Sequence, residues 1–485
     1  MDGKKLSHYK NTNDEMFGMF FKKKLPREHC KPYWSWFLEQ SSSDLRSANA
    51  EAELLFKKFG ITFTMYATDD SSEETEIDRT IPFDLIPRIL SKTEWSFLER
   101  GLLQRTLALN YFLADVYGKG KIFSDGEIPA ELIFKNSQFR FQMHGITPPD
   151  NIYAHVSGTD LVRTKDDNFF VLEDNLRVPS GVSYMIENRK VMMRLFPEVF
   201  ETNKVSPIEH YPDLLLKHLK SMAKTFSDDP NVVLLTPGVF NSAYFEHAYL
   251  AQQMGIELVE GRDLFVENER VFMKTTAGSI RVDVIYRRID DDFIDPLFFR
   301  PDSVLGVPGL LAVIRSGGVV LCNAVGTGIA DDKSVYPYVP EMIKFYLGEE
   351  PLLHNVKTYL CRNKRHKSYV LKNLNKLVVK EVHGAGGVGM LVGPLATKNE
   401  IARYKGRIEA SPEKFIAQPM LALSTSPTYV NQEIVPRHVD LRPFVLHGPN
   451  PVVVPGGLTR VALKEGSVVV NSSQGGGTKD TWVIW

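Results

Sequence analysis

The sequence is poor in cysteine and has no excess of charge of either sign. Three cysteines, Cys30, Cys322 and Cys361, are spread over 485 residues, so neither a disulfide framework nor a zinc site is indicated. Lys and Arg total 58 against 59 for Asp and Glu, which leaves a net charge of -1. Such a chain has no overall field to attract nucleic acid or anionic lipid. Any attraction for phosphate must be local.

The sequence also lacks a hydrophobic run that would suit a membrane span or an export signal. The most apolar long window, 307–330, contains Arg315 and several glycines, whereas a membrane-spanning helix needs about 20 mostly apolar residues. We interpret this window as buried strand and turn. The first residues are polar and no apolar stretch of signal-peptide length follows them. We therefore expect a cytoplasmic protein that binds neither membrane nor nucleic acid.

What the chain does contain is enough apolar sequence for a large core. It is 43% hydrophobic and 24% charged, and its length favours two to four domains. Between Lys92 and Tyr117, apolar residues recur at helical spacing with charged residues on the other face, which predicts a helix. The stretch 69–76 is acidic and rich in serine, which predicts an exposed loop. No internal repeat is visible.

Two further patterns divide the chain. Short β-rich runs at 153–156 and 169–172, separated by the polar turn 165–168, predict a hairpin. Polar and proline residues between about 206 and 230 indicate a domain boundary. Strand-like and helix-like runs then alternate to about residue 350, which predicts a mostly parallel α/β sheet. Strands are expected at 232–235, 256–260, 282–286 and 319–321, and helices at 245–254 and 341–347. We interpret 362–367 as a basic link, followed by a β-rich region with glycine turns.

A strand with one lysine and a glycine-rich turn form the first candidate for phosphate binding. Lys380 lies in the apolar run 377–382, and Gly384, Gly386, Gly387 and Gly389 follow. Glycines let backbone N–H groups approach phosphate oxygens, and the lysine supplies a charge. The segment matches neither the GxxxxGK[ST] loop nor the GxGxxG motif that precedes a long helix. The alternative is a glycine-rich hairpin with an exposed lysine.

Later strands carry further polar groups. Gln418, near the end of the apolar run 414–420, could meet an adenine edge. Asp440 and Arg442 occupy alternate positions of a strand and so share one face, and Arg460 follows in a similar run. The alternative is that these residues form an exposed strand face. Together they offer groups for phosphate but too few metal ligands.

The metal ligands come from the predicted hairpin near residue 170. Its pairing would align Asp160 with Glu173 and Asn175, and the last two share one strand face. Two carboxylates and an amide oxygen suit Mg²⁺, which keeps the rest of its coordination sphere for water and phosphate. The alternative is a capped hairpin with surface acids.

The order of these segments is reversed relative to an ordinary ATP-using ligase. Read from 323 to 485 and then from about 130 to 181, the chain resembles the ATP-grasp superfamily segment by segment. Its order resembles the circularly permuted group related to glutathionylspermidine synthetase-like ligases. Asn323 and Asp331-Asp332-Lys333 look like the pre-ATP-grasp domain, Lys380 like the small lobe, and Asn471 like part of the large lobe. Four further segments look like family signatures, namely 172–184, 286–291, 326–333 and 472–477.

The resemblance implies an α/β (α+β) protein with a circularly permuted ATP-grasp fold, a Rossmann-like pre-ATP-grasp domain and an N-terminal helical region. It covers about 80 to 485. The domains we expect are an N-terminal region of unknown role at 1–80, a helical segment with the permuted end of the large lobe at 81–205, the pre-ATP-grasp domain at 206–355, and the small lobe with the first part of the large lobe at 356–485.

The resemblance also implies a reaction. ATP would phosphorylate a carboxylate, and an amine would attack the acyl phosphate to form an amide. Lys380, Arg442 and Arg460 would act on phosphate, the four glycines and Gln418 would bind ATP, and Asp160, Glu173 and Asn175 would bind Mg²⁺. The substrates would be a small-molecule or peptide carboxylate and an amine, and a partner protein or a homo-oligomer stays possible. Two alternatives stay open, namely a phosphotransferase and a non-catalytic nucleotide-binding partner.

The acceptor site is the least defined. Arg287 and Arg288 end a predicted strand of the α/β region, where open sheets bind ligands, and a guanidinium there could hold a substrate carboxylate. The alternative is a surface salt-bridge cluster with Asp290 and Asp291. Arg177 and Tyr184 are further candidates. A single histidine on a predicted helix, His247, is expected to be structural because no second histidine stands at metal spacing.

Overall fold

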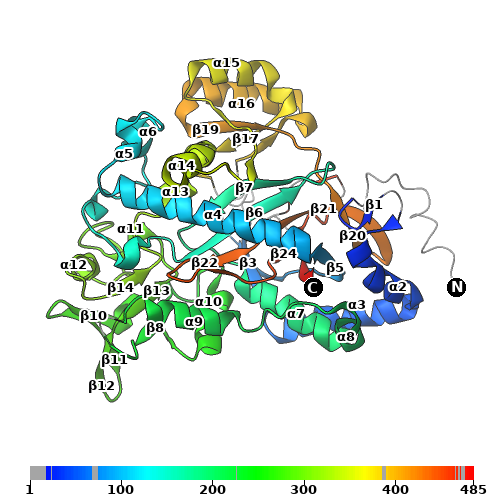
Figure 1. The fold of residues 1–485 in the computed structure, drawn as a ribbon, viewed down its shortest axis with the longest axis horizontal. Coiled ribbons are helices and arrows are strands. Elements are labelled where there is room, and N and C mark those ends of the chain that lie inside the picture. The colour runs from blue at the N-terminus through cyan, green and yellow to red at the C-terminus, as the bar shows by residue number, and fades with distance from the viewer. Residues whose placement is uncertain are drawn as a thin grey trace.

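A computed structural model gives the fold and describes residues 18–22, 25–67, 75–224, 227–384, 389–464, 466–467, 470 and 476–485. A large mixed sheet forms the centre, with a small antiparallel lobe on one side of it and a parallel α/β unit on the other (Figure 1). Among the described residues no helix combines the length and apolar character needed to cross a membrane.

The large sheet joins strands from the two ends of the sequence. Its main path runs β15-β7-β6-β21-β24-β25-β5. Off this path, β20 pairs with β21, and β22 pairs with both β6 and β23. Its strands are β5 (Phe83–Ser91), β6 (Val156–Arg163), β7 (Phe169–Asn175), β15 (His354–Asn355), β20 (Thr425–Val430), β21 (Glu433–Arg442), β22 (Phe444–Leu446), β23 (Val452–Val453), β24 (Leu458–Val461) and β25 (Gly477–Ile484). Early β6 pairs with late β21 and β22, and late β25 runs parallel to early β5. This interleaving is what a circular permutation of a sheet produces.

The predicted hairpin is present as β6 and β7. The two strands are antiparallel, with Asp160 opposite Glu173 and Gly158 opposite Asn175. The register shifts by one residue after Asp160. The predicted alignment of Asp160 with Glu173 is therefore confirmed.

The predicted long helix is also present, as α4 (Lys92–Val116). It begins at a capping box in which Ser91 accepts from the Glu94 backbone N–H and the Glu94 carboxylate accepts from Ser91 N. Its apolar side, including Leu98 and Leu102, packs in one core with residues of the large sheet. Figure 1 shows the helix lying across that sheet.

The predicted alternating region forms a parallel sheet of order β14-β13-β8-β9. Its strands are β8 (Val232–Leu235), β9 (Glu257–Val259), β13 (Val284–Arg287) and β14 (Val320–Cys322), and the helices of this part of the chain are α9 (Tyr211–Ser221), α10 (Tyr244–Met254), α11 (Asp291–Ile294), α12 (Leu310–Arg315), α13 (Gly328–Asp331) and α14 (Val339–Leu347). The prediction of a parallel sheet is confirmed. The window 307–330 holds β14 but also α12 and α13, so its interpretation as strand and turn alone was wrong. An antiparallel meander that we did not predict consists of β10 (Leu264–Glu267), β11 (Arg270–Thr275) and β12 (Gly278–Val282).

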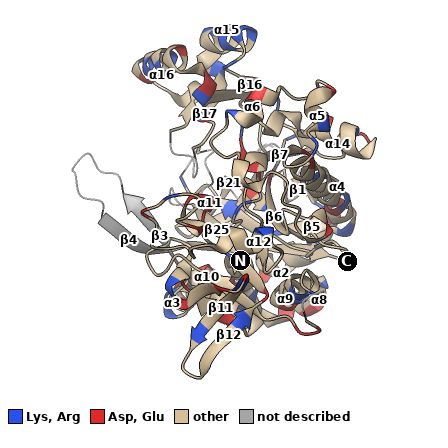
Figure 2. Cartoon of the chain, turned by 90° about the vertical axis from the view of Figure 1, so that its left-hand side faces the viewer, with Lys and Arg blue, Asp and Glu red and all other residues tan. Residues whose placement is uncertain are grey.

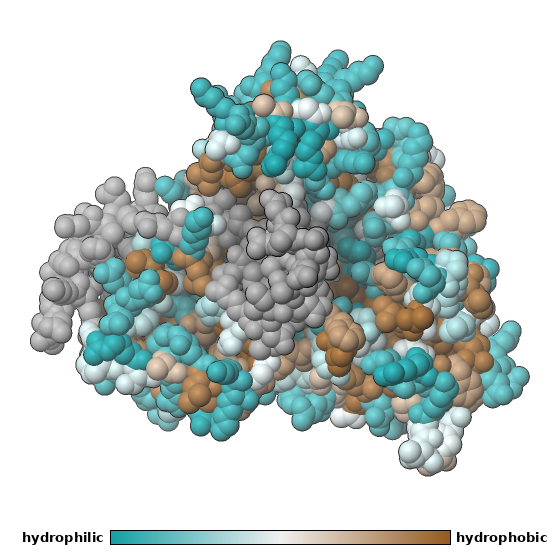
Figure 3. All heavy atoms as spheres, turned by 180° about the vertical axis from the view of Figure 1, so that it is seen from behind, coloured by the Kyte–Doolittle hydropathy of each residue, from teal (hydrophilic) through white to brown (hydrophobic). Residues whose placement is uncertain are grey.

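The small lobe is an antiparallel sheet of order β16-β19-β17-β18 with two helices. Its elements are β16 (Tyr359–Leu360), α15 (Lys364–Asn373), β17 (Leu377–Glu381), β18 (Leu391–Val392), α16 (Lys398–Ala410) and β19 (Phe415–Pro419). The interpretation of 362–367 as a link was wrong, because α15 begins at Lys364, where the Asn363 side chain accepts from two backbone N–H groups. Figure 2 shows basic residues on both helices and acidic residues on α16, and Figure 3 shows this lobe to be mostly hydrophilic outside. Its apolar side chains form a core of their own.

The remaining helices are α2 (Lys31–Glu39), α3 (Ser42–Lys58), α5 (Lys121–Ser124), α6 (Ala130–Phe134), α7 (Val182–Leu195) and α8 (Pro197–Asn203), with the two-stranded ladders β1 (Phe21–Lys22) with β2 (Leu25–Pro26) and β3 (Thr62–Ala67) with β4 (Thr75–Thr80). The N-terminal helices share a core with the large sheet, where the Tyr33 hydroxyl donates to Leu85 O. Most of the acidic stretch predicted as a loop lies outside the described residues, and its end belongs to β4.

Candidate functional site

Two adjoining cavities lie at the large sheet. The first, of about 170 Å³, lies between that sheet and the small lobe and has a mainly apolar wall that includes Leu172, Val378, Met390, Val392, Met420 and Leu421. The second, of about 370 Å³, is lined mainly by polar groups and extends to the α/β unit. Both are lined by Glu173, Lys333, Gly384 and Arg460. An apolar chamber therefore meets a polar one at four residues, three of them charged.

Lys380 is on β17 and lines the apolar cavity, as the strand pattern predicts. Within the described residues its ammonium group has no hydrogen bond or ion pair. The pKa of Lys380 lies below its ordinary value, mainly because of burial. The nearby carboxylates of Glu173 and Asp160 oppose this shift, and the Lys333 ammonium adds to it. Gln418, on the neighbouring strand β19, also lines this cavity, and its Nε2 donates to Thr358 Oγ1 at 2.9 Å. Both residues thus come to the same chamber.

The glycine turn is described in part. Gly386 and Gly387 lie outside the described residues, as does Asn471. Gly384 lines both cavities, and its carbonyl accepts from Lys333 Nζ at 2.6 Å. Gly389 has φ +71°, a backbone conformation that disfavours any residue with a Cβ, so a substitution there would be strained.

Four charged side chains of the large sheet form one buried network. Asp160 accepts from Arg442 Nε at 2.5 Å and Nη2 at 2.8 Å, and from Arg460 Nη2 at 2.6 Å. Arg460 Nε also donates to Asp440 at 3.0 Å. Burial disfavours the charged form of Asp160, but Arg442 and Arg460 hold its pKa below the ordinary value. Burial raises the pKa of Asp440. As the side chains stand, Asp160 is a partner of two arginines rather than an open ligand.

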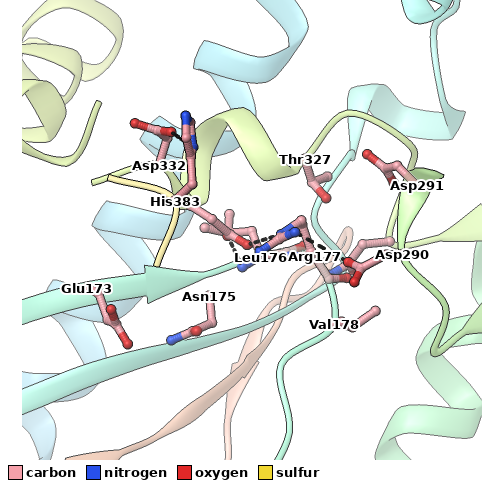
Figure 4. A network of polar contacts seen from close by, with 12 residues as sticks. Glu173, Asn175, Leu176, Arg177, Val178, Asp290, Asp291, Thr327, Asp332 and His383 are labelled. Carbon is pink, nitrogen blue, oxygen red and sulfur yellow. Dashed lines mark hydrogen bonds and ion pairs between the residues drawn. The ribbon is translucent and has the colours of Figure 1, made fainter. Parts of the chain in front are cut away.

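Glu173 and Asn175 are the more open oxygen ligands. Figure 4 shows both side chains on one face of β7. The Glu173 side chain is 33% exposed and lies 3.7 Å from Lys333 Nζ. Asn175 Nδ2 donates to Gly158 O at 3.2 Å, and its Oδ1 has no hydrogen bond within the described part of the chain. No three His, Cys, Asp or Glu side chains of the described residues are grouped as metal ligands. The donor set of one carboxylate and one amide oxygen suits a cation such as Mg²⁺ that keeps several waters.

Arg177 and Tyr184 line the polar cavity. Arg177 Nη1 donates to Asp290 at 3.3 Å (Figure 4), and its Nε donates to Asp331 at 3.0 Å. The side chain is 33% exposed. The Tyr184 ring stacks on Phe245 with centroids 5.8 Å apart. Arg177 is therefore open to this cavity, whereas Tyr184 lines it with only 4% of its surface exposed.

The other two predicted substrate residues, Arg287 and Arg288, are buried, and we correct their assignment. The Arg287 guanidinium donates to three backbone carbonyls and pairs with Asp291 at 2.6 Å. Arg288 donates to Pro179 O at 2.8 Å and pairs with Glu246 at 3.1 Å. Neither lines the polar cavity, because these contacts hold the guanidinium groups inside the protein. The alternative of a surface salt-bridge cluster was also wrong for both arginines.

Sequence reasoning missed two residues that shape the site. Glu246, on α10, accepts from Gly181 N at 2.7 Å and Ser183 N at 3.0 Å at the start of α7, which fixes one wall of the polar cavity. His383 lines the same cavity, although its position before the glycine turn could have drawn attention. The histidine expected to be structural, His247, is buried and hydrogen-bonded to Thr236 Oγ1 at 2.9 Å, which confirms that interpretation.

The sequence matches a known family over most of its length. The family described as circularly permuted ATP-grasp type 2 matches residues 87–462. An uncharacterized protein of Synechocystis is 52% identical over 98% of this chain and 97% of its own length. An uncharacterized protein of Mycobacterium tuberculosis is 51% identical over 93% of this chain and 81% of its own length.

Two further comparisons concern named proteins. A putative glutamate–cysteine ligase of Frankia casuarinae is 43% identical over 87% of this chain, which spans 48% of the Frankia protein. A solved glutathione synthetase-like effector of Globodera pallida, in its apo form, superimposes with a TM-score of 0.56 at 12% identity, over 92% of this chain and 98% of the other, which shows a shared fold. With the family match and the 52% identity over nearly the whole chain, the protein belongs to the circularly permuted ATP-grasp type 2 family.

Proposed function

We propose that this protein is an ATP-dependent carboxylate–amine ligase. The observation that carries the proposal is the junction of the two cavities, where Glu173, Lys333 and Arg460 are placed between an apolar chamber and a polar one. A nucleotide has an apolar base and a charged triphosphate, and a carboxylate substrate is polar. The two cavities suit those two molecules, whose reacting ends would meet at the junction.

The apolar cavity receives the adenine ring, with Gln418 at its edge. Lys380, which has no hydrogen bond or ion pair among the described residues, offers its ammonium group to the phosphates from the same wall. Arg460 and Arg442 add positive charge from the large sheet, and Gly384, which lines both cavities, begins the glycine segment that we assign to the phosphates. Positioned cations of this kind stabilise the charge that develops during phosphoryl transfer.

Glu173 and Asn175 are the residues that would hold Mg²⁺, with Asp160 behind them in the arginine network. A bound Mg²⁺ supplies charge neutralisation at the phosphate oxygens. The chain's own part is to present two oxygens on one strand face and to keep Lys333 close to them.

The polar cavity receives the carboxylate substrate, for which Arg177 and Tyr184 are the contacts we assign. In the reaction, a carboxylate oxygen takes the terminal phosphoryl group of ATP and ADP leaves. The amine nitrogen then attacks the acyl carbon, the bond from carbon to the phosphate oxygen breaks, and an amide, inorganic phosphate and a proton are formed.

The names of the Frankia relatives support an amide-forming reaction, since both are putative glutamate–cysteine ligases. Each of those proteins is about twice as long as the matched region, because the chain spans 48% of either one. The names therefore support the reaction class but not the identity of the acid or the amine.

The first test is thermal unfolding with and without MgATP. A ligand present at 100 times its dissociation constant stabilises the folded state by about 2.7 kcal/mol. We expect a magnesium-dependent rise in Tm that Lys380→Ala and Glu173→Gln both lose. Lys376→Ala and Glu409→Gln, which change exposed residues of the small lobe, should keep it. A rise that survives in either site variant would contradict the assignment of that residue.

The second test is release of ADP with pooled carboxylic acids and amines, followed by mass analysis. An ADP-coupled amide product supports the ligase. A stable phosphorylated product without an amide would identify a phosphotransferase instead, and MgATP binding without ADP release from any pool would indicate a non-catalytic nucleotide-binding protein.

A further inference from the structure

A histidine and an aspartate form a pair at the polar cavity that the proposed phosphate and metal sites do not use. His383 Nδ1 lies 3.3 Å from Asp332 Oδ2, and both residues line the cavity. The Asp332 side chain is 1% exposed, whereas the His383 side chain is 49% exposed. Figure 4 shows the two side chains facing each other. One partner is fixed in the protein and the other reaches the solvent of the cavity.

The aspartate is held in place and ionised. Its Oδ1 accepts from Ser334 N at 2.7 Å and also from the Ser334 hydroxyl. Burial disfavours the carboxylate, but the interactions with His383, Ser334 and Asn136 hold the pKa of Asp332 below its ordinary value. A fixed carboxylate at Nδ1 favours the tautomer with the proton on that nitrogen. Nε2 of His383 then carries a lone pair.

The other carboxylates that line the polar cavity are already engaged. Asp174 is paired with Arg105 at 2.6 Å, and Asp331 with Arg177 at 3.0 Å. Glu173 is next to Lys333 and is assigned to the metal. The remaining charged groups of the wall, Arg442 and Arg460, are cations. Among the described residues of this wall, His383 is the titratable base without a cationic partner.

An amide-forming reaction needs such a base, because most amines are protonated near neutral pH and an ammonium ion is no nucleophile. We propose that His383 accepts the proton of the attacking amine and that Asp332 positions its imidazole. This inference rests on the proposed ligase function. As the nitrogen attacks the acyl carbon, the carbon–oxygen bond to the phosphate breaks, the N–H proton moves to His383 Nε2, and inorganic phosphate leaves.

The pair would also serve a merely structural purpose by tying the start of the glycine turn to the segment of Asp332. The test must therefore separate proton transfer from positioning of the turn. Hydroxylamine does this, because it is unprotonated at neutral pH and attacks acyl phosphates without a base. A variant whose glycine turn is still in place forms hydroxamate. A variant that lacks only the base loses product formation with protonated amines alone.

The experiment uses the full-length protein with an acid and an amine found by ADP release. General base catalysis contributes about 10²–10⁴-fold. His383→Gln should lose amide formation by a factor in this range yet retain hydroxamate formation and the MgATP-dependent rise in Tm. His144→Gln, at an exposed histidine outside the cavity, serves as control and should change nothing.

Asp332→Asn provides a second variant and a readout independent of activity. In protein labelled with ¹⁵N-histidine, the His383 signals, assigned by their loss in His383→Gln, should show the Nδ1–H tautomer in the wild type and a shift from it in Asp332→Asn. If His383→Gln loses amide and hydroxamate formation equally, or loses neither, the proposed role of His383 is overturned while the ligase function stands. If the wild type binds MgATP but forms no hydroxamate from any acid, the ligase function fails and the role of His383 fails with it.

Discussion

Replacing Asn323 by alanine should destabilise the protein strongly, although the side chain is small and touches no proposed ligand. The residue is 1% exposed. Its four shortest side-chain hydrogen bonds are those that Oδ1 accepts from His155 N at 2.7 Å and Val156 N at 2.8 Å, and those that Nδ2 donates to Val156 O at 2.7 Å and Leu176 O at 2.6 Å. A longer bond of 3.3 Å from Nδ2 to Arg177 O is left out of the calculation that follows. The four shortest carry the argument. These four bonds join the end of β14 to the two ends of the β6–β7 hairpin.

At about 0.5–1.5 kcal/mol for each bond, the loss of four gives roughly 2–6 kcal/mol. We expect the upper half of that range, because alanine leaves two N–H groups and two carbonyls buried without these partners. Asn373→Ala is the matched control, since Asn373 is only partly buried, makes one side-chain bond to Tyr369 O at 2.8 Å and should change stability by about 0.5 kcal/mol or less.

Urea unfolding followed by circular dichroism measures the difference. Amide hydrogen exchange gives a local readout, because the His155 and Val156 N–H groups should exchange faster in Asn323→Ala than in Asn373→Ala. A urea midpoint equal to that of the control would refute the reasoning, since four buried backbone groups would then have been freed at no cost.

Three further predictions concern buried groups elsewhere. Glu246→Ala should cost about 3–5 kcal/mol in urea unfolding, because it leaves a buried Arg288 without its charge partner, and a cost below about 1 kcal/mol would contradict this. Burial raises the pKa of Asp331 from 3.8 to about 6, which corresponds to about 3 kcal/mol of folding free energy for the protonated form. This stabilisation is fully present below pH ~3.8 and is lost as the pH rises through 6. Asp331→Asn should abolish this part of the pH profile, and identical profiles would refute it. Burial raises the pKa of the Cys361 thiol to about 12, and Cys30 and Cys322 are buried too. A thiol reagent at pH 8 should therefore label the protein only after unfolding. Rapid labelling of the native state would contradict this.

The features that could be predicted from the sequence are those set by local patterns. The pairing of Asp160 with Glu173 follows from strand alternation and from a polar turn of fixed length. The strand that carries Lys380 and the parallel α/β sheet follow from apolar runs whose spacing is that of strands or of helices. The helix at Lys364 was missed because a run of basic residues was interpreted by its charge, although Lys and Arg favour helices and Asn363 is a good cap.

Features set by distant contacts could not be predicted in this way. Arg287, Arg288 and Arg177 are alike in sequence, yet two of them are buried against carbonyls and carboxylates while the third reaches a cavity. The sequence does not show which guanidinium is enclosed, because that depends on strands brought together by the fold. Asp160 likewise reads as a metal ligand until Arg442 and Arg460 are placed beside it.

The interleaving of early and late strands in the large sheet has a consequence for biosynthesis. Asp160 and Arg442 are 282 positions apart in the chain. At a synthesis rate of about 5–20 residues per second, the β6–β7 hairpin leaves the ribosome roughly 14 to 56 s before the arginine that its aspartate pairs with. During that interval the hairpin has an open edge and an unpaired acid. The nascent chain therefore has no complete site until its last quarter is made, and chaperones that shield strand edges should matter more for this protein than its final stability suggests.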